Sequence, residues 1–317
     1  MQPLKIGTRE SELAVWQAKQ VQTLLKQTSV ASELIFISSQ GDVDLITPLY
    51  EMGVQGIFTK TLDSALLNKR IDIAVHSMKD VPTQLPQGIK QAAVLQRGSY
   101  KDLLVFKDRS IVDRWQLTVD RKATPLGDVG IIATSSIRRK AQWLHRYPDH
   151  TIENLRGNIN TRLRKLKDST WNAAIFAAAG LERINLRPEN SIELDWMLPA
   201  PAQGAIMIVC RKDDKDTFNI CRTFNHRHTE LCTKIERDFL RKLIGGCSTP
   251  ISALAEVVND KIFFKGNICS ADGEQKIDIN KETSIKDCSE TGIVAAEELL
   301  TQPAVQAILY EIRNAKK

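Results

Sequence analysis

Residues 71–82, with the sequence IDIAVHSMKDVP, place four titratable or hydroxyl side chains after a short apolar run. The run at 71–75 predicts a buried strand, and Pro82 ends the segment that follows it. Before this segment the chain alternates between the two apolar spacings, with strand patterns at 4–7 and 34–37 and helix patterns at 11–26 and around 58–66. This βαβ rhythm predicts a parallel sheet covered by helices, which is the arrangement of an α/β fold.

The same alternation starts again near residue 103 and indicates a second α/β domain. Strand patterns lie at 103–106, 129–133 and 173–176, and helix patterns lie at 136–145 and 159–166. A further strand at 205–210 could return to the first sheet. The polar stretch at 108–127 has weak periodicity and predicts an excursion on the surface.

Beyond residue 225 the pattern changes and indicates a small α+β domain. A helix is predicted at 229–243, strands at 251–257, 261–266 and 276–279, and terminal helices from residue 293 onward. The length of 317 residues and the mass of 35.6 kDa also favour two or three domains. We therefore predict three, which comprise residues 1–98 with 200–220, residues 102–197, and residues 226–317.

The composition is that of a globular protein, with 42% hydrophobic and 26% charged residues. The longest apolar runs, around 175–181 and 205–210, fall well short of the roughly 20 residues of a membrane-spanning helix. The first residues enter a strand pattern at Leu4, with neither a basic segment before an apolar core nor a small-residue cleavage site. We therefore expect a cytoplasmic protein that does not span a membrane.

Four polar loops follow predicted strands, where ligands collect in open α/β sheets. They are GTRES at 7–11, HSMKDVP at 76–82, TSSIRR at 134–139 and RGNINTR at 156–162, with Arg183 after the next strand and helix. Backbone N–H groups, hydroxyls and arginines in such loops bind carboxylates or phosphates. A plainer interpretation stays open for each loop: a helix cap at 7–11, an exposed Lys79 and Asp80 ion pair beside a structural His76, and solvated arginines.

The charge pattern favours a small polyanion over a nucleic acid. Lys and Arg number 44 against 38 Asp and Glu, so the net charge of +6 is compatible with either partner. Aromatic residues make up only 6% of the chain, and the four loops contain none, whereas nucleic-acid sites usually add aromatic platforms or an extended basic stripe. No P-loop, GxGxxG, GxSxG or HExxH pattern occurs.

The cysteines all lie in the last third of the chain, at positions Cys210, Cys221, Cys232, Cys247, Cys269 and Cys288. None forms a CxxC pair, so we expect reduced thiols rather than a disulfide framework. Cys247 follows two glycines on a tight loop, where a thiol could be a nucleophile or a covalent tether, although most cysteines are small buried hydrophobic residues. The cysteines and histidines at 221–232 lack ordinary zinc spacing, so we predict no metal site.

Six ordered segments resemble one family across essentially the whole chain. They are TRESELA at 8–14, DIAVHSMKDVP at 72–82, TSSIRR at 134–139, LRGN at 155–158 with TRL at 161–163, AGLER at 179–183 and GGC at 245–247. The family is porphobilinogen deaminase, also called hydroxymethylbilane synthase.

The resemblance implies two α/β domains similar to periplasmic binding proteins and a smaller C-terminal α+β domain. It implies a transferase that condenses four porphobilinogen molecules head to tail, with loss of ammonia, on a dipyrromethane cofactor. Hydrolysis then releases linear hydroxymethylbilane for tetrapyrrole (haem) biosynthesis. The cofactor would be attached to Cys247 through a thioether, and the family leads us to expect a monomer.

The matching positions also imply residue roles. Asp80 would be the catalytic residue, binding pyrrole N–H groups and stabilising the cationic azafulvene that forms when ammonia leaves. The residues that would bind the cofactor, besides Cys247, are Ser77, Lys79, Thr134, Ser135, Ser136, Arg138, Arg139 and Arg162. Those that would bind the substrate and the growing chain are Arg9, Ser11, Arg156 and Arg183.

Three positions depart from the family pattern, which has glycine in place of Ala133 and Ala202 and lysine in place of Gln55. The alanines bring into question a close backbone approach at two segments that face the cleft. Two other hypotheses remain at this point: an anion-binding protein in which Cys247 is merely structural, and a nucleic-acid-binding protein with a steep salt dependence.

Overall fold

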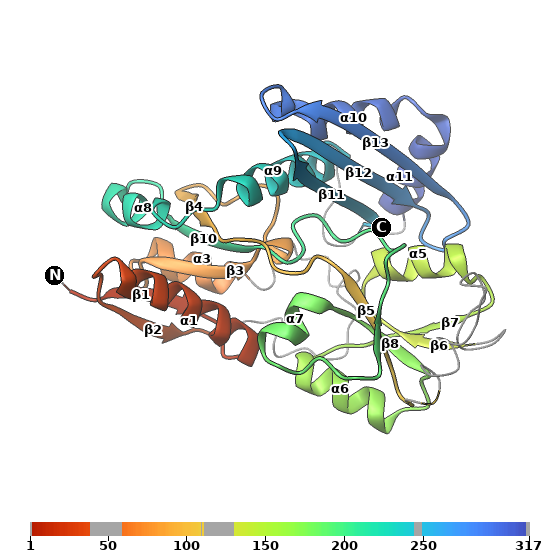
Figure 1. Cartoon of the computed structure of the whole chain (residues 1–317), viewed down its shortest axis with the longest axis horizontal. Coiled ribbons are helices and arrows are strands. Elements are labelled where there is room, and N and C mark those ends of the chain that lie inside the picture. Colours follow the sequence, from red (N-terminus) through yellow and green to blue (C-terminus); the bar gives the residue numbers. More distant parts are fainter. Residues whose placement is uncertain (1, 39–58, 109, 111–129, 244–248, 315–317) are drawn as a thin grey trace.

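The computed structural model describes residues 2–38, 59–108, 110, 130–243 and 249–314, and these form three sheets with covering helices (Figure 1). The first sheet has the strand order β2-β1-β3-β10-β4. Its strands are β1 (Leu4–Thr8), β2 (Ser32–Phe36), β3 (Ile73–Ser77), β4 (Ile89–Val94) and β10 (Ile206–Arg211). Helices α1 (Glu12–Gln27) and α8 (Lys215–Arg222) pack on one face, and α3 (Lys60–Leu67) packs on the other.

The second sheet has the same number of strands, in the order β7-β6-β8-β5-β9. Its strands are β5 (Asp102–Phe106), β6 (Ile131–Ala133), β7 (Thr151–Glu153), β8 (Ala173–Ala177) and β9 (Ser191–Glu193). Helix α5 (Ile137–Arg146) covers one face, and α6 (Ile159–Asp168) and α7 (Ala178–Arg183) cover the other. Trp143 of α5 is the largest side chain of this core and is 1% exposed.

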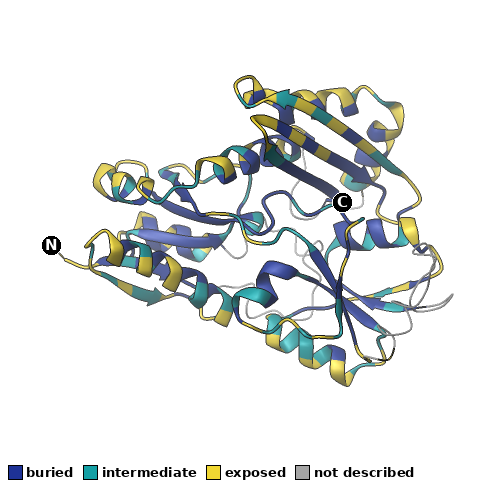
Figure 2. Cartoon of the chain, in the orientation of Figure 1, coloured by how far each residue is buried: buried dark blue, intermediate teal, exposed yellow. Residues whose placement is uncertain are grey.

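The third sheet is antiparallel and consists of β11 (Ile251–Val258), β12 (Lys261–Cys269) and β13 (Lys276–Ser284). Helices α9 (Arg227–Lys242), α10 (Thr291–Leu300) and α11 (Pro303–Asn314) pack on one face, where the rings of Phe239 and Phe264 lie 5.1 Å apart. Buried and exposed residues alternate at 261–265 of β12, as expected where one face of a sheet is solvated, whereas residues 251–255 of β11 are all buried (Figure 2). Two single turns complete the described elements, η1 (Met78–Asp80) and η2 (Cys288–Glu290).

The predicted α/β fold class, with a smaller α+β part, is confirmed, but the first two sheets, predicted to be parallel, are parallel only in part. Pairs β1–β2, β1–β3, β6–β7 and β6–β8 are parallel. Strand β10 runs antiparallel to β3 and β4, and β5 runs antiparallel to β8 and β9. The reason is topological, because β5 and β10 each enter their sheet from a segment that crosses over from the other sheet.

Sequence patterns missed the short or polar elements β4, β7, β9 and α8 and gave no range for α7 (Ala178–Arg183). Strands of three residues, such as TIE in β7, are too short to show alternation. Apart from Asp108 and Ser110, the predicted excursion at 108–127 lies outside the described residues. The three domain boundaries stay a prediction. Within the described part of the chain, no helix is both long enough and apolar enough to cross a membrane.

Two segments cross between the first and second sheets, residues 95–101 and residues 194–205, and we call them the crossing segments. A buried carboxylate binds both of them to the third sheet. Glu236 of α9 is fully buried and accepts two bonds from the Arg97 guanidinium, at 2.6 and 3.1 Å. It also accepts the backbone N–H of Ala202, at 2.6 Å, and that of Ala255, at 2.8 Å. One side chain thus holds together segments from all three sheets.

The second crossing segment contains two left-handed residues close together. Ala202 has φ 62° and Gly204 has φ 85°. A β-carbon at Gly204 would lie 2.6 Å from the carbonyl oxygen of Ser99 and 2.8 Å from that of Gly98, on the other crossing segment. The two segments can therefore run this close only because residue 204 is glycine.

We predict that Gly204→Ala lowers the free energy of unfolding by about 2 kcal/mol or more, because it adds left-handed strain to a backbone clash. Ala202→Gly is the matched control. In Ala202→Gly, the relief of about 1 kcal/mol of backbone strain is offset by the loss of a buried methyl group and by the greater conformational freedom of the unfolded chain. We therefore expect its free energy of unfolding to stay within about 1 kcal/mol of the wild-type value. Urea denaturation measures both, and equal effects would contradict the prediction.

Candidate functional site

A cavity of about 620 Å³ lies between the first two sheets, and the third domain's residues Leu240, Thr249 and Ile251 complete its wall. Every predicted site residue that the structure describes lines this cavity: Arg9, Ser11, Ser77, Lys79, Asp80, Thr134, Ser135, Ser136, Arg138, Arg139, Arg156, Arg162 and Arg183. Cys247 lies outside the described residues.

The topology explains why side chains so far apart in the sequence meet. Arg9 follows β1, Lys79 and Asp80 follow β3, and Ser135 follows β6. Strands β1 and β3 run parallel to each other in the first sheet, as β6 and β8 do in the second, so their carboxyl ends lie at one edge of each sheet. The two edges face the same cavity. Helices α5, α6 and α7 and the loop between β7 and α6 add the remaining arginines to it.

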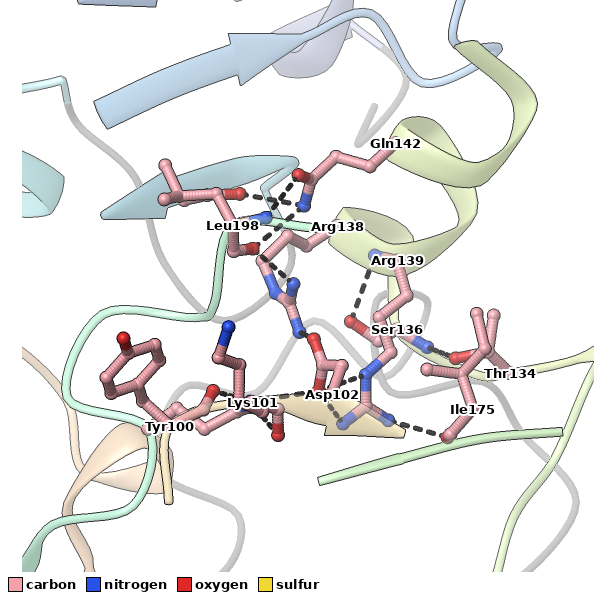
Figure 3. A network of polar contacts seen from close by, with 12 residues as sticks. Tyr100, Lys101, Asp102, Thr134, Ser136, Arg138, Arg139, Gln142, Ile175 and Leu198 are labelled. Carbon is pink, nitrogen blue, oxygen red and sulfur yellow. Dashed lines mark hydrogen bonds and ion pairs between the residues drawn. The ribbon is translucent and has the colours of Figure 1, made fainter. Parts of the chain in front are cut away.

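Asp102, the first residue of β5, holds the two arginines of α5 (Figure 3). Its Oδ2 accepts Nη2 of Arg138 at 2.7 Å, and its Oδ1 accepts Nη2 and Nε of Arg139 at 2.8 and 3.2 Å. The carboxylate is fully buried. Arg138 also donates to the carbonyl oxygen of Leu198, at 2.7 Å, and Arg139 to that of Ile175, at 2.9 Å. Both guanidinium groups are therefore fixed in place.

The electrostatics of this triad favour its charged form. Burial alone would raise the pKa of Asp102, but Arg138 and Arg139 hold that pKa well below its usual range. Burial lowers the pKa of Arg138, and Asp102 opposes that shift. A single carboxylate thus neutralises part of a buried cationic cluster.

The hydroxyls at 134–136 all have hydrogen-bond partners nearby, either in their own turn or in the loop that follows β7. Ser135 Oγ lies 2.5 Å from both Asn154 Oδ1 and the carbonyl oxygen of Leu155, and it accepts the N–H of Leu155 at 3.0 Å. Ser136 Oγ accepts the N–H of Arg139 and so caps α5. Thr134 Oγ1 accepts the N–H of Ser136, at 3.2 Å. These hydroxyls therefore shape the loop that faces the cavity.

The turn after β3 presents Lys79 and Asp80 to the cavity. Lys79 Nζ donates to Gln203 Oε1 at 3.3 Å, and the Gln203 amide nitrogen donates to Asp102 Oδ1 at 2.9 Å and to the carbonyl oxygen of Tyr100 at 2.8 Å. Burial lowers the pKa of Lys79 to about 8, an effect that the Arg139 and Arg138 charges reinforce and the Asp80 and Asp102 charges oppose. The polar groups form one connected network.

The arginines of the second domain leave positive charge in excess. Arg162 Nε donates to the carbonyl oxygen of Gly157 at 2.7 Å. Its pKa falls to about 10, first because it is buried and then because Arg139 and Arg156 repel its charge. Like charges held this close predict a bound anion that offsets their repulsion.

Arg183 lines the cavity and also joins two domains. Its Nη2 donates to the carbonyl oxygen of Gly204, at 2.6 Å, and its guanidinium lies 5.6 Å from the ring centre of Trp16 on α1. Burial lowers its pKa to about 10.

Ser11 stands at the N-cap of α1 without a side-chain capping bond.

Sequence reasoning missed Asp102 and Gln203. Asp102 directly precedes the apolar run at 103–106 and had the pattern of a loop residue. Gln203 lies in a crossing segment that shows no periodicity. One signal could have pointed to Asp102, since it is an acidic residue at the start of an otherwise apolar strand. A carboxylate that is buried in such a place needs a positively charged or hydrogen-bonding partner.

The departures from the family pattern lie beside the cavity rather than in its wall. Among the described residues that line it, neither Ala133 nor Ala202 is present. Both side chains are fully buried, Ala133 in the core of the second sheet and Ala202 in that of the first. Gln55 lies outside the described residues.

Three of the histidines and cysteines at 221–232, namely Cys221, His226 and Cys232, have structural roles. His226 caps α9, where its Nδ1 accepts the N–H of Thr229. Cys221 and Cys232 are buried, and burial raises the pKa of both thiols to about 12. In the described ranges no three acidic, histidine or cysteine side chains are placed to hold a metal ion. His76 is also buried, which lowers its pKa to about 3 and keeps it neutral.

Solved structures with a similar chain course include several periplasmic or transport-related binding domains. The BvgS VFT2 domain of Bordetella pertussis is 10% identical, covers 69% of this chain and 84% of its own, and has a TM-score of 0.40. An amino acid ABC transporter substrate-binding protein of Streptococcus pneumoniae, solved with L-arginine, is 13% identical, covers 72% and 89%, and has a TM-score of 0.38.

Two family models match the chain in sequence order. The model of the porphobilinogen deaminase dipyrromethane cofactor binding domain matches residues 4–219, and that of the porphobilinogen deaminase C-terminal domain matches residues 230–301. The first match contains every described residue of the cavity's cationic cluster, and the second contains Cys247. The chain belongs to the porphobilinogen deaminase family, the transferases that use a dipyrromethane cofactor to make hydroxymethylbilane from porphobilinogen for tetrapyrrole synthesis.

Proposed function

We propose that this chain joins four porphobilinogen molecules in the cavity beside Asp80, on a dipyrromethane attached to Cys247 through a thioether. The observation that carries the proposal is that Lys79 and the arginines surround Asp80 in one cavity of about 620 Å³. Each pyrrole brings an acetate and a propionate, so a chain of pyrroles needs many cations rather than one anion site.

The residues present fit the cofactor. Hydrogen bonds to Asp102 hold Arg138 and Arg139 in the cavity wall. The charges of Arg139 and Arg156 repel that of Arg162. Carboxylates of a bound dipyrromethane would remove that repulsion. When bound, the cofactor supplies the pyrrole carbon to which the first substrate is joined.

Asp80 is the proposed catalytic residue. Its carboxylate would accept pyrrole N–H groups and stabilise the positive charge that develops on the substrate as ammonia leaves. The proposed cofactor ligands besides Cys247 are Ser77, Lys79, Thr134, Ser135, Ser136, Arg138, Arg139 and Arg162. The proposed ligands of the substrate and growing chain are Arg9, Ser11, Arg156 and Arg183.

The proposal extends to the state of the protein. We propose a cytoplasmic monomer without a nucleic-acid partner, divided into domains 1–98 with 200–220, 102–197 and 226–317. The family matches support the boundary before residue 226, since one model ends at residue 219 and the next begins at residue 230. Light scattering on the purified protein tests whether it is a monomer. An oligonucleotide titration at low salt tests whether it binds nucleic acid.

We predict that the wild-type protein carries an adduct of two condensed pyrrole units that survives denaturation, and that Cys247→Ser lacks it. The reason is that a thioether is covalent, whereas the other contacts proposed here are lost on unfolding. Intact mass spectrometry under denaturing conditions measures both proteins. Cys269→Ser is the matched control, because Cys269 is buried and should leave the adduct in place.

An unmodified wild-type mass that stays unchanged after addition of porphobilinogen would contradict this attachment. It would favour an anion-binding protein in which Cys247 is structural. An adduct that persists in Cys247→Ser would place the attachment on another residue.

We predict that Asp102→Asn lowers the free energy of unfolding by about 3–5 kcal/mol, because it leaves Arg138 and Arg139 buried without their counter-charge. The control is Asp195→Asn, the same change in an exposed carboxylate that pairs with Lys101. We expect less than about 1 kcal/mol there. Urea denaturation measures both, and similar small losses would show that Asp102 does not hold the arginines.

We predict that cofactor loading depends on the charge of Lys79. Its pKa is lowered to about 8, so the cation that binds a carboxylate is lost as the pH rises through that value. Lys79→Arg keeps its charge. The rate at which cofactor-free protein gains the adduct, followed by mass spectrometry, should therefore fall for wild type relative to Lys79→Arg between pH 7 and about 9.5. A constant ratio of the two rates would contradict a role for this amine.

A further inference from the structure

One arginine of the third domain holds the backbone of the Asp80 turn. Arg237, on α9, is buried, and its Nη1 donates to the carbonyl oxygens of Val81 at 2.8 Å and Met78 at 3.3 Å. Its Nη2 donates to the carbonyl oxygen of Pro82 at 2.6 Å. The bonded carbonyls lie on both sides of Asp80 in the sequence, so one rigid guanidinium brackets the proposed catalytic residue.

The turn has little regular structure of its own to fix it. It is a single 3₁₀ turn of three residues, closed by the bond from Val81 N to Met78 O at 3.2 Å. Buried carbonyl groups need hydrogen-bond partners, and Arg237 supplies charged ones. A neutral or shorter side chain at 237 would leave the carbonyls of Val81 and Pro82 without those donors.

The neighbouring residue on α9 holds the crossing segments. Adjacent residues of a helix point about 100° apart, so Glu236 and Arg237 can bind different parts of the protein. Glu236 binds Arg97 and the Ala202 backbone, while Arg237 binds the turn. The chain continues from the end of α9 at Lys242 to Cys247, the proposed attachment residue.

We propose that Arg237 is a positioning residue for Asp80. Helix α9 thereby keeps the carboxylate at a constant place relative to the crossing segments and to the start of the chain segment that carries the cofactor. This inference rests on the proposed function, in which Asp80 is the catalytic residue. A small displacement of a reacting group is enough to cost about a hundredfold in rate.

The first experiment compares Arg237→Gln with Arg241→Gln, a control one turn later on the same helix. Arg241 is 55% exposed and pairs with Asp238. For Arg237→Gln we expect kcat to fall at least tenfold while KM stays within about threefold and the cofactor adduct stays complete by intact mass. Arg241→Gln should keep kcat within about twofold. An unchanged kcat in Arg237→Gln overturns the proposal.

Arg237→Lys keeps the test open if the glutamine variant folds poorly. A lysine retains the charge but not the planar fork, so it should recover part of the lost kcat. A lysine variant with full adduct, a wild-type melting temperature and a kcat as low as that of the glutamine variant also supports positioning. A wild-type kcat in Arg237→Lys would show that the planar guanidinium is not needed to position Asp80, which overturns the proposal.

A double-mutant cycle separates positioning of Asp80 from a general structural effect. If Arg237 acts through Asp80, Arg237→Gln should lower single-turnover rates by less than about twofold in an Asp80→Ala background, against at least tenfold in wild type. The same factor in both backgrounds overturns the proposal. A wild-type rate in Asp80→Ala alone would instead refute the proposed function, so the two failures are distinguishable.

Discussion

The buried ion triad of Asp102 with Arg138 and Arg139 is the interaction on which the cavity depends. Arginines that bind a polyanion repel one another when they are held together in a buried place, and burial alone also disfavours their charge. Asp102, which is fully buried, compensates for both effects. Because it is the first residue of β5, the strand that enters from the other sheet, the charge balance of the site is tied to the way the chain crosses over. Gln203, on the returning segment, extends the same network to Lys79.

The third domain links the elements that the chemistry needs. Glu236 holds the crossing segments, Arg237 holds the turn after β3, and both are residues of α9. The two crossing segments approach each other closely at Gly204. Positive charge in the cavity remains in excess after Asp102 is counted, because Lys79 and six arginines line the cavity, against Glu10, Glu12 and Asp80. An anionic cofactor therefore completes an electrostatic balance that the protein alone leaves unfinished.

The departures at Ala133 and Ala202 show how a cleft can tolerate changes in residues beside it. Both methyl groups are accommodated in the cores of the sheets and not in the cavity. Ala202 keeps the left-handed backbone that suits a glycine, at a cost in strain, while its N–H still reaches Glu236.

Local patterns in the sequence determined the strands and helices with clear periodicity and the polar loops at their ends. The family resemblance then supplied the residue roles. Short elements such as β7 and the antiparallel course of β5 and β10 could not be predicted, because direction and pairing depend on contacts between distant segments. For the same reason Asp102 and Arg237 escaped notice. The role of a buried charged residue depends on the groups to which it binds, and the spacing of residues along the chain does not show which groups these are. The sequence by itself determined which groups bind anions, whereas the tertiary structure decided which carboxylate balances them and which helix holds Asp80 in place.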